Sequence, residues 1–148
     1  MYKTILVPVD GSAMATKALD SAIALSQTFG ASLVTLCVYR HHSPLEASFS
    51  MVRAQSESQN RPDDALKSYA SEIASAAKER ARAAGVADVY GYAKRGQPSR
   101  AIVEFSRQHG VDLIVMGARG TGDIEGFLLG SVSYKVSSLA SVPCLIVR

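Results

Sequence analysis

Short runs of hydrophobic residues alternate along this chain with stretches of helical period. Five runs rich in branched or aromatic side chains predict β-strands, at residues 4–9, 32–38, 88–93, 112–116 and 144–147. Between most of these runs, apolar residues recur every three to four positions, which predicts helices. Strands separated by helices pair in parallel through right-handed crossovers, so the pattern predicts a doubly wound α/β sheet with helices on both faces.

The ends of several predicted helices carry residues that commonly start or end a helix. After the first strand, Asp10-Gly11-Ser12 interrupts the apolar run and can cap a helix, which Gly30 ends in a left-handed conformation. Pro98 suits the first turn of a later helix, because its missing N–H has no partner there, and that helix ends near Gly110.

The middle of the chain predicts a long loop followed by a long helix. Residues 41–64 are polar, contain two prolines and show no sustained period. From Asp63 an apolar stripe predicts a helix that Gly85 closes, with inward positions Leu66, Tyr69, Ala70, Ile73, Ala77, Ala81 and Ala84. The last helix is predicted to present Leu129, Val132, Val136 and Leu139 on one face.

Composition narrows the class of protein. With 148 residues and 47% hydrophobic content, we expect one domain over residues 1–148. A net charge of +3, spread along the chain with basic residues densest at 78–82, argues against nucleic-acid binding. No apolar run approaches the ~18 residues that span a bilayer, and the first apolar run is too short for the hydrophobic region of a signal peptide, so we expect a cytoplasmic location. Cys37 and Cys144 lie in apolar strands, which favours buried thiols over a disulfide.

A glycine-rich segment carries the candidate chemistry. Met116-Gly117-Ala118-Arg119-Gly120 follows the fourth strand, and Gly130-Ser131 opens the last helix. Glycines let a backbone approach phosphates closely, the amides of Gly130, Ser131 and Val132 can donate to them, and Arg119 can screen further charge. Turns at the glycines and a capping role for Ser131 are the alternative interpretation. The segment is neither a Walker A loop nor a dinucleotide fingerprint.

The same residues resemble a known family. Gly117, Gly120, Gly130 and Ser131 match the G-x2-G-x9-G-[S/T] ATP-binding pattern of universal stress proteins. ILVPVDGS, DLIVMGARG, GSVSYKV and VPCLIVR also resemble family segments, as does Gly96-Gln97-Pro98 before the third helix. The resemblance covers most of the chain except residues 41–64.

This resemblance implies an adenine nucleotide alpha hydrolase-like fold of strand order 3-2-1-4-5, with the switch point between strands 1 and 4. It implies that Asp10, by itself typical of a turn or helix cap, lies near the ribose and phosphates, and that the backbone of Val38 faces adenine. The implied nucleotide site consists of Pro8, Val9, Asp10, Val38, Met116, Gly117, Arg119, Gly120, Gly130, Ser131, Val132 and Ser133. The resemblance also implies a homodimer formed partly through residues 144–147.

The function expected from these features is ATP binding, with or without Mg²⁺, in a regulatory module that serves an unidentified protein partner. Hydrolysis is expected to be slow or absent, because no general base is evident. A Mg²⁺-dependent ATPase or phosphotransferase using Asp10 or Asp123, and a nucleotide-free dimeric scaffold, are the alternatives. Asp123 and Glu125 are interpreted as solvated loop carboxylates, and the adjacent His41 and His42 do not predict a metal site. The loop after the first strand lacks the SGGxDS pattern of ATP pyrophosphatases.

Overall fold

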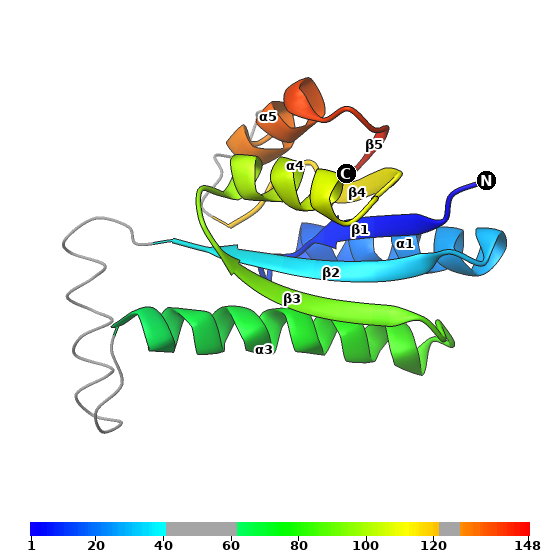
Figure 1. Cartoon of the computed structure of the whole chain (residues 1–148), viewed down its shortest axis with the longest axis horizontal. Helices are drawn as coiled ribbons and strands as arrows, with labels where there is room; N and C mark the ends of the chain where they lie inside the picture. The colour runs from blue at the N-terminus through cyan, green and yellow to red at the C-terminus, as the bar shows by residue number, and fades with distance from the viewer. Residues whose placement is uncertain (41–61, 122–127) are drawn as a thin grey trace.

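Five parallel strands in the order β3-β2-β1-β4-β5 form the central sheet of the molecule. The computed structural model describes residues 1–40, 62–121 and 128–148 (Figure 1). The described elements are, in chain order, β1 (Thr4–Pro8), α1 (Ala13–Phe29), β2 (Ser32–Tyr39), α3 (Pro62–Ala83), β3 (Val89–Arg95), α4 (Pro98–Gln108), β4 (Leu113–Gly117), α5 (Ser131–Leu139) and β5 (Cys144–Val147). The predicted fold class and strand order are confirmed.

Two hydrophobic cores lie on opposite faces of the sheet, because alternate residues of a strand point to opposite sides. Ile5 and Val7 of β1 pack in the core that includes α1 and α3, whereas Leu6 packs in the core that includes α4 and α5. All three side chains are fully buried. Covering on both faces explains why β1 and β4 are apolar along almost their whole length.

The ends predicted for α1 and the start predicted for α4 are confirmed. Ser12 is the N-cap of α1, where its hydroxyl accepts a hydrogen bond from the Ala15 N–H at 3.2 Å. Gly30 ends α1 with a φ of 66°, a left-handed conformation that costs glycine little. Pro98 occupies the first turn of α4, which Gln97 caps.

The predictions for α3 are partly wrong. The helix begins at Pro62, one residue before the predicted start at Asp63, so the predicted loop does not extend to residue 64; residues 41–61 lie outside the described part. Acidic residues in its first turn favour this earlier start through the helix dipole. Tyr69 is 60% exposed, contrary to the prediction, whereas the predicted inward residues Ala70, Ala77 and Ala81 are buried, together with Ala74. Small residues are required because the α3 backbone comes close to β3.

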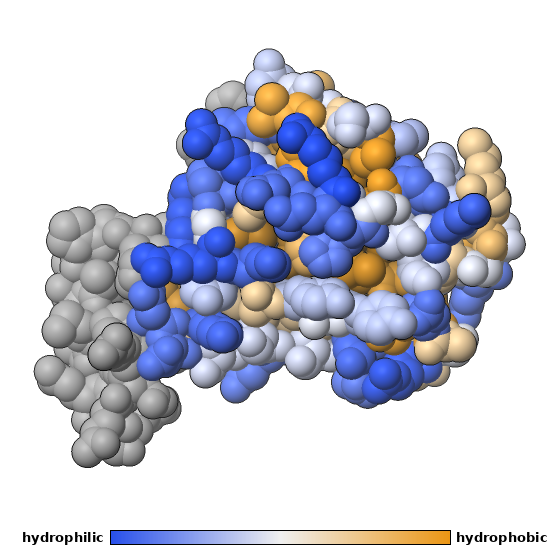
Figure 2. All heavy atoms as spheres, viewed as in Figure 1, coloured by the Kyte–Doolittle hydropathy of each residue, from blue (hydrophilic) through white to orange (hydrophobic). Residues whose placement is uncertain are grey.

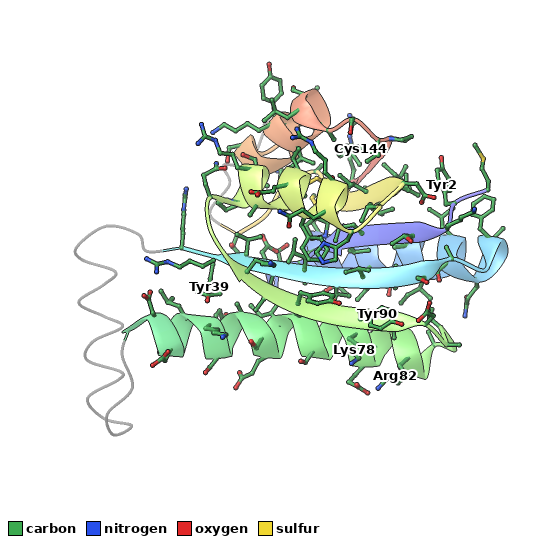
Figure 3. The ribbon with its side chains drawn as sticks, viewed as in Figure 1. Tyr2, Tyr39, Lys78, Arg82, Tyr90 and Cys144 are labelled. Atoms are coloured by element: carbon green, nitrogen blue, oxygen red, sulfur yellow. The ribbon has the colours of Figure 1, made fainter. Side chains whose placement is uncertain are left out.

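The outer side of α3 is polar, as the sequence predicted for its basic stretch. Figure 3 shows Lys78 and Arg82 projecting from the helix away from the sheet. Arg80 forms a bidentate ion pair with Asp20 of α1, with N–O distances of 2.8 and 2.9 Å. This pairing lowers the pKa of the Asp20 carboxyl, but both side chains are about half exposed, so its contribution to stability is small.

The C-terminal elements leave apolar surface in solvent. Leu139, predicted on the inner face of the last helix, is 54% exposed because α5 ends at this residue, whereas Val136 is fully buried. Leu145 of the edge strand β5 is 40% exposed. Figure 2 shows hydrophobic atoms gathered over α5 and β5.

Both cysteines are free thiols in strands; Cys37 is buried, as predicted, whereas Cys144 is only partly buried. Burial, and secondarily the charge of Asp10, raises the pKa of the Cys37 thiol to about 11. The thiol is therefore protonated at neutral pH and a poor nucleophile. Among the described helices, none has the length and apolar character needed to cross a membrane.

We predict that Gly91→Ala destabilises the fold. A methyl group there would lie 3.2 Å from the Ala74 carbonyl oxygen and 3.2 Å from Thr35 Oγ1, atoms that already share a hydrogen bond of 2.8 Å. The free energy of unfolding in urea should fall by about 1–3 kcal/mol. Lys94→Ala, at an exposed position of the same strand, should change it by less than about 0.5 kcal/mol. Equal unfolding midpoints for both variants would show that the close α3–β3 contact is not needed.

Candidate functional site

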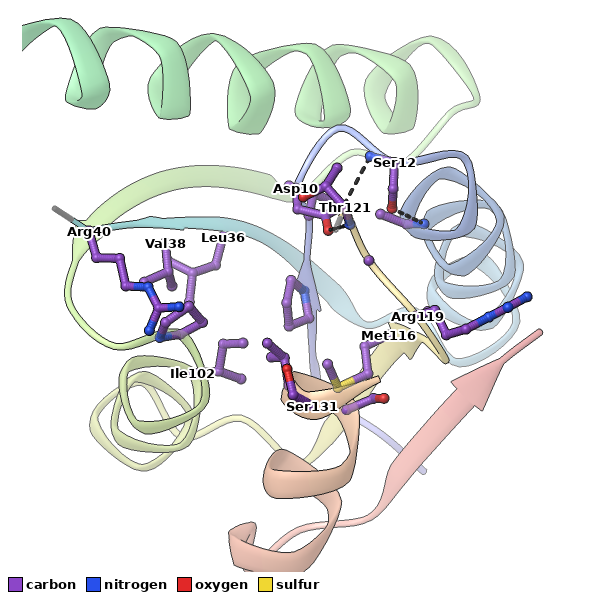
Figure 4. A pocket seen from close by; sticks show the side chains of 18 residues that line it. Asp10, Ser12, Leu36, Val38, Arg40, Ile102, Met116, Arg119, Thr121 and Ser131 are labelled. Atoms are coloured by element: carbon purple, nitrogen blue, oxygen red, sulfur yellow. Dashed lines mark hydrogen bonds between the residues drawn. The ribbon is translucent and has the colours of Figure 1, made fainter. Parts of the chain in front are cut away.

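A pocket of about 260 Å³ opens at the carboxyl ends of β1, β2 and β4 (Figure 4). The chain leaves β1 toward β2 on one side and reaches β4 on the other, so the crevice lies at the point where the strand order reverses. In parallel α/β sheets this is the position where ligands bind. All predicted site residues except Gly130 line the pocket: Pro8, Val9, Asp10, Val38, Met116, Gly117, Arg119, Gly120, Ser131, Val132 and Ser133.

Gly117, the first glycine of the loop, allows close packing against α1 and does not adopt an unusual backbone angle. A Cβ on Gly117 would lie 3.0 Å from the Met14 carbonyl carbon and 3.1 Å from the Met14 oxygen and Cβ. The end of β4 therefore runs directly against the first turn of α1. The next residues continue this contact, since the Arg119 N–H donates to Met14 Sδ at 3.3 Å.

Hydrogen bonds to the backbone of Ala118 join the two ends of the glycine-rich segment. The Ala118 oxygen accepts the Gly130 N–H at 2.6 Å and the buried Ser133 hydroxyl at 2.5 Å. The Ala118 N–H donates to the Val147 oxygen at 2.7 Å, which attaches the same residue to β5. The start of α5 is thereby held beside the end of β4.

This bonding corrects the predicted role of Gly130. Its N–H is already donated to Ala118, so it is not a phosphate donor, and Gly130 itself does not line the pocket. Gly130 is the N-cap of α5 and Ser131 is the first helical residue, so Ser131 is not the cap either. Within the described residues, the amides of Ser131, Val132 and Ser133 have no acceptor.

Three helix starts border the pocket, and they differ in capping. Ser12 caps α1, and the Gln97 side chain accepts from the Arg100 N–H at 2.8 Å in α4. In the described part of the chain, no side chain caps α5. The first turn of α5 consequently offers more unpaired amides to an external acceptor than the first turn of α1 or α4 does.

Asp10 joins the loop after β1 to the glycine-rich segment. Its Oδ1 accepts the Ser12 N–H and its Oδ2 accepts the Thr121 N–H, each at 2.9 Å. Asp10 therefore lies beside the glycine loop, as predicted, but its carboxylate is engaged with backbone amides. This arrangement orients the loop and gives Asp10 a structural task at the mouth of the pocket.

The two arginines at the pocket are directed differently. In Figure 4 the Arg119 side chain points away from Ser131 and the centre of the pocket, so it is not placed there to screen a ligand's charge as predicted. Arg40, at the end of β2, extends toward the start of α4.

Several lining residues were not among the predicted ones: Ser12, Ala15, Leu36, Arg40, Pro98, Ile102 and Thr121. Alternation along β2 could have indicated Leu36 and Arg40, since they share a face with Val38. Pro98 was predicted to start a helix. Because it follows the carboxyl end of β3, the sequence could have indicated that it lies near the pocket. Ile102 could not be found from the sequence, because only packing brings α4 against β2. Asp123, Glu125, His41 and His42 lie outside the described residues.

Comparison with known proteins agrees with the resemblance. A model of the universal stress protein family matches residues 1–148. Universal stress protein YxiE of Bacillus subtilis is 37% identical over 149 residues, covering 100% of both chains. Among solved structures, UspA from Lactobacillus plantarum has a TM-score of 0.80 at 27% identity, covering 99% of this chain and 98% of its own. A universal stress protein in complex with cAMP has a TM-score of 0.73 at 29% identity, covering 99% and 97%.

We predict that Asp10→Asn loosens the glycine-rich segment. Asparagine has a single side-chain oxygen, so either Ser12 or Thr121 loses its acceptor, and the unfolding free energy should fall by about 1–3 kcal/mol. Amide hydrogen exchange at Thr121, followed by NMR, should accelerate.

Asp112→Asn is the matched control for this variant. Asp112 also accepts two backbone amides, from Lys3 at 2.8 Å and Thr4 at 3.1 Å, but at the opposite edge of the sheet. It should destabilise the protein by a similar amount and leave the Thr121 exchange rate unchanged once global stability is taken into account. Equal acceleration in both variants would contradict a local role for Asp10.

Proposed function

Because the chain belongs to the universal stress protein family, we propose that it binds ATP in the pocket described above. The observation that carries this proposal is the start of α5, where the amides of Ser131, Val132 and Ser133 lack acceptors among the described residues. Unpaired amides and the positive end of the helix dipole together favour phosphate oxygens. The phosphates would therefore lie beside α5.

The base would lie at the end of β2. The last bond between the β1 segment and β2 joins the Val9 N–H to the Leu36 oxygen at 2.9 Å. The backbone groups of every second residue in a parallel strand point toward the same neighbouring strand. The N–H and C=O of Val38 therefore point to the same side of β2 as those of Leu36, where the described residues offer them no partner. One donor and one acceptor side by side complement the ring nitrogen N1 and the amino group of adenine.

A related structure supports the class of ligand. The universal stress protein that is 29% identical to this chain was solved with cAMP, an adenine nucleotide. Adenine and phosphate are the groups that the Val38 backbone and the start of α5 suit.

Little or no hydrolysis is expected from this pocket. Both Asp10 oxygens accept backbone amides, so the carboxylate is not a free base for an attacking water. Within the described ranges, no group of three or more His, Cys, Asp or Glu side chains is placed to hold a metal ion. Any Mg²⁺ would accompany the phosphates of the nucleotide.

A regulatory role follows from how the pocket is connected. Ala118 is bonded to the start of α5 and also to Val147 at the end of β5. A nucleotide held at α5 would therefore bias the position of β5. We propose that a homodimer forms partly through β5 and that its nucleotide-dependent state is sensed by a protein partner in the stress response. The unpaired edge of β5 and the 40% exposure of Leu145 support this interface.

The ATP site is tested by Ser131→Pro. Proline removes the Ser131 N–H at the first helical position, where proline is tolerated, and the extended Gly130 (φ −75°, ψ 170°) is compatible with a following proline. Calorimetry should show ATP affinity falling about 10- to 100-fold. Ser131→Ala, which removes only the hydroxyl, should cost far less. If the wild-type protein releases no heat with any adenine nucleotide, the scaffold alternative holds. Rapid ADP formation, near about 10 per second, would favour the ATPase alternative.

The dimer is tested by Leu145→Lys. A lysine on an edge strand opposes pairing with a second strand, because its charge would be desolvated in the interface. Light scattering after size exclusion should show a shift from dimer to monomer. Tyr90→Lys, at a 49% exposed position of the other edge strand, should remain dimeric. A wild-type monomer, or a dimer unaffected by Leu145→Lys, would contradict an interface at β5.

A further inference from the structure

Arg40 is a cation on the wall of the pocket that has no partner among the described residues. It directly follows β2, its side chain is exposed, and it lines the pocket together with Val38 of the same strand. Within the described residues, no hydrogen bond or ion pair engages its guanidinium. Within the described part of the chain, Arg40 therefore has no evident role in holding the fold.

The surroundings of Arg40 are apolar. Figure 4 shows its side chain running from the end of β2 toward α4, on the side of the pocket where Ile102 lies and across from Ser131. Val38 and Ile102 lie near Arg40 in Figure 4, and Pro98 also lines the pocket. As far as the described residues show, this end combines aliphatic side chains with the positive charge of Arg40.

A flat aromatic group suits this combination better than a phosphate does. The unpaired amides that favour phosphate lie at the start of α5, on the other side of the pocket. A guanidinium is planar and weakly hydrated, and it stacks on aromatic rings through cation–π and dispersion attraction.

We propose that Arg40 stacks on the face of the nucleotide base and sets the affinity for the base without contacting the phosphates. The inference rests on the proposed nucleotide site and deepens it, since it names a residue that determines specificity. Val38 backbone groups would contact the edge of the ring, and Arg40 would cover a face. Both contacts come from the end of β2, so one strand would recognise the base.

The test compares Arg40→Lys with Arg40→Ala, using ATP and inorganic tripolyphosphate as ligands. Lysine keeps the charge but loses the planar face, so both variants should bind ATP about three- to tenfold more weakly. Tripolyphosphate affinity, measured by competition against ATP, should be the same in both variants as in the wild type. Arg100→Lys is the matched control, because Arg100 is an exposed arginine of α4 that does not line the pocket.

The outcomes separate this inference from the proposed function. If Arg40→Lys binds ATP as the wild type does, or if tripolyphosphate affinity falls in parallel with ATP affinity, stacking by Arg40 is wrong although the nucleotide site stands. If the wild-type protein does not bind ATP at all, the proposed function is wrong and this inference with it. Loss confined to ATP in both Arg40 variants, with Arg100→Lys unchanged, supports the stacking role.

Discussion

The geometry of the pocket depends on the backbone of Ala118. Its carbonyl oxygen accepts from the Gly130 N–H and the Ser133 hydroxyl, and its N–H donates to Val147. These bonds hold the start of α5 beside the end of β4 and attach both to β5. They also occupy the Gly130 amide, so the donors left at the start of α5 begin one residue later. A helix end fixed in this way is preorganised, since no ordering of the helix is needed when a ligand binds.

Helix α5 differs from α1 and α4 in how its first turn is capped. The first turns of α1 and α4 receive side-chain acceptors from Ser12 and Gln97, so fewer of their amides remain for a ligand. At α5 the N-cap is a glycine, which has no side chain to offer. Because side chains cap two of the helices that border the pocket but not α5, the start of α5 is the side of the pocket that would favour an anion. The other side, formed by β2 and α4, is left for an uncharged group.

Asp10 shows how one side chain can serve a site without offering its charge to a ligand. Its two oxygens hold the amides of Ser12 and Thr121, which lie far apart in the sequence. The carboxylate thereby closes the pocket on the α1 side and orients the segment after Gly117. In the universal stress protein family to which this chain belongs, the acid after the first strand was expected near the nucleotide, and this position is compatible with that role.

The sequence by itself determined the strands, their parallel pairing and most helix ends. These features depend on the spacing of hydrophobic residues and on residues such as Ser12, Gly30 and Pro98, whose effect on the backbone is local. It also indicated the residues around Gly117 and Ser131, since a glycine pattern is visible without a structure. Only the tertiary structure decided that Gly130 donates to Ala118, that Arg119 turns away and that Arg40 and Ile102 line the pocket. It also showed that Tyr69, which was predicted on the inward face of α3 together with the alanines, is exposed. Those outcomes depend on contacts between segments distant in the chain, which no local pattern specifies.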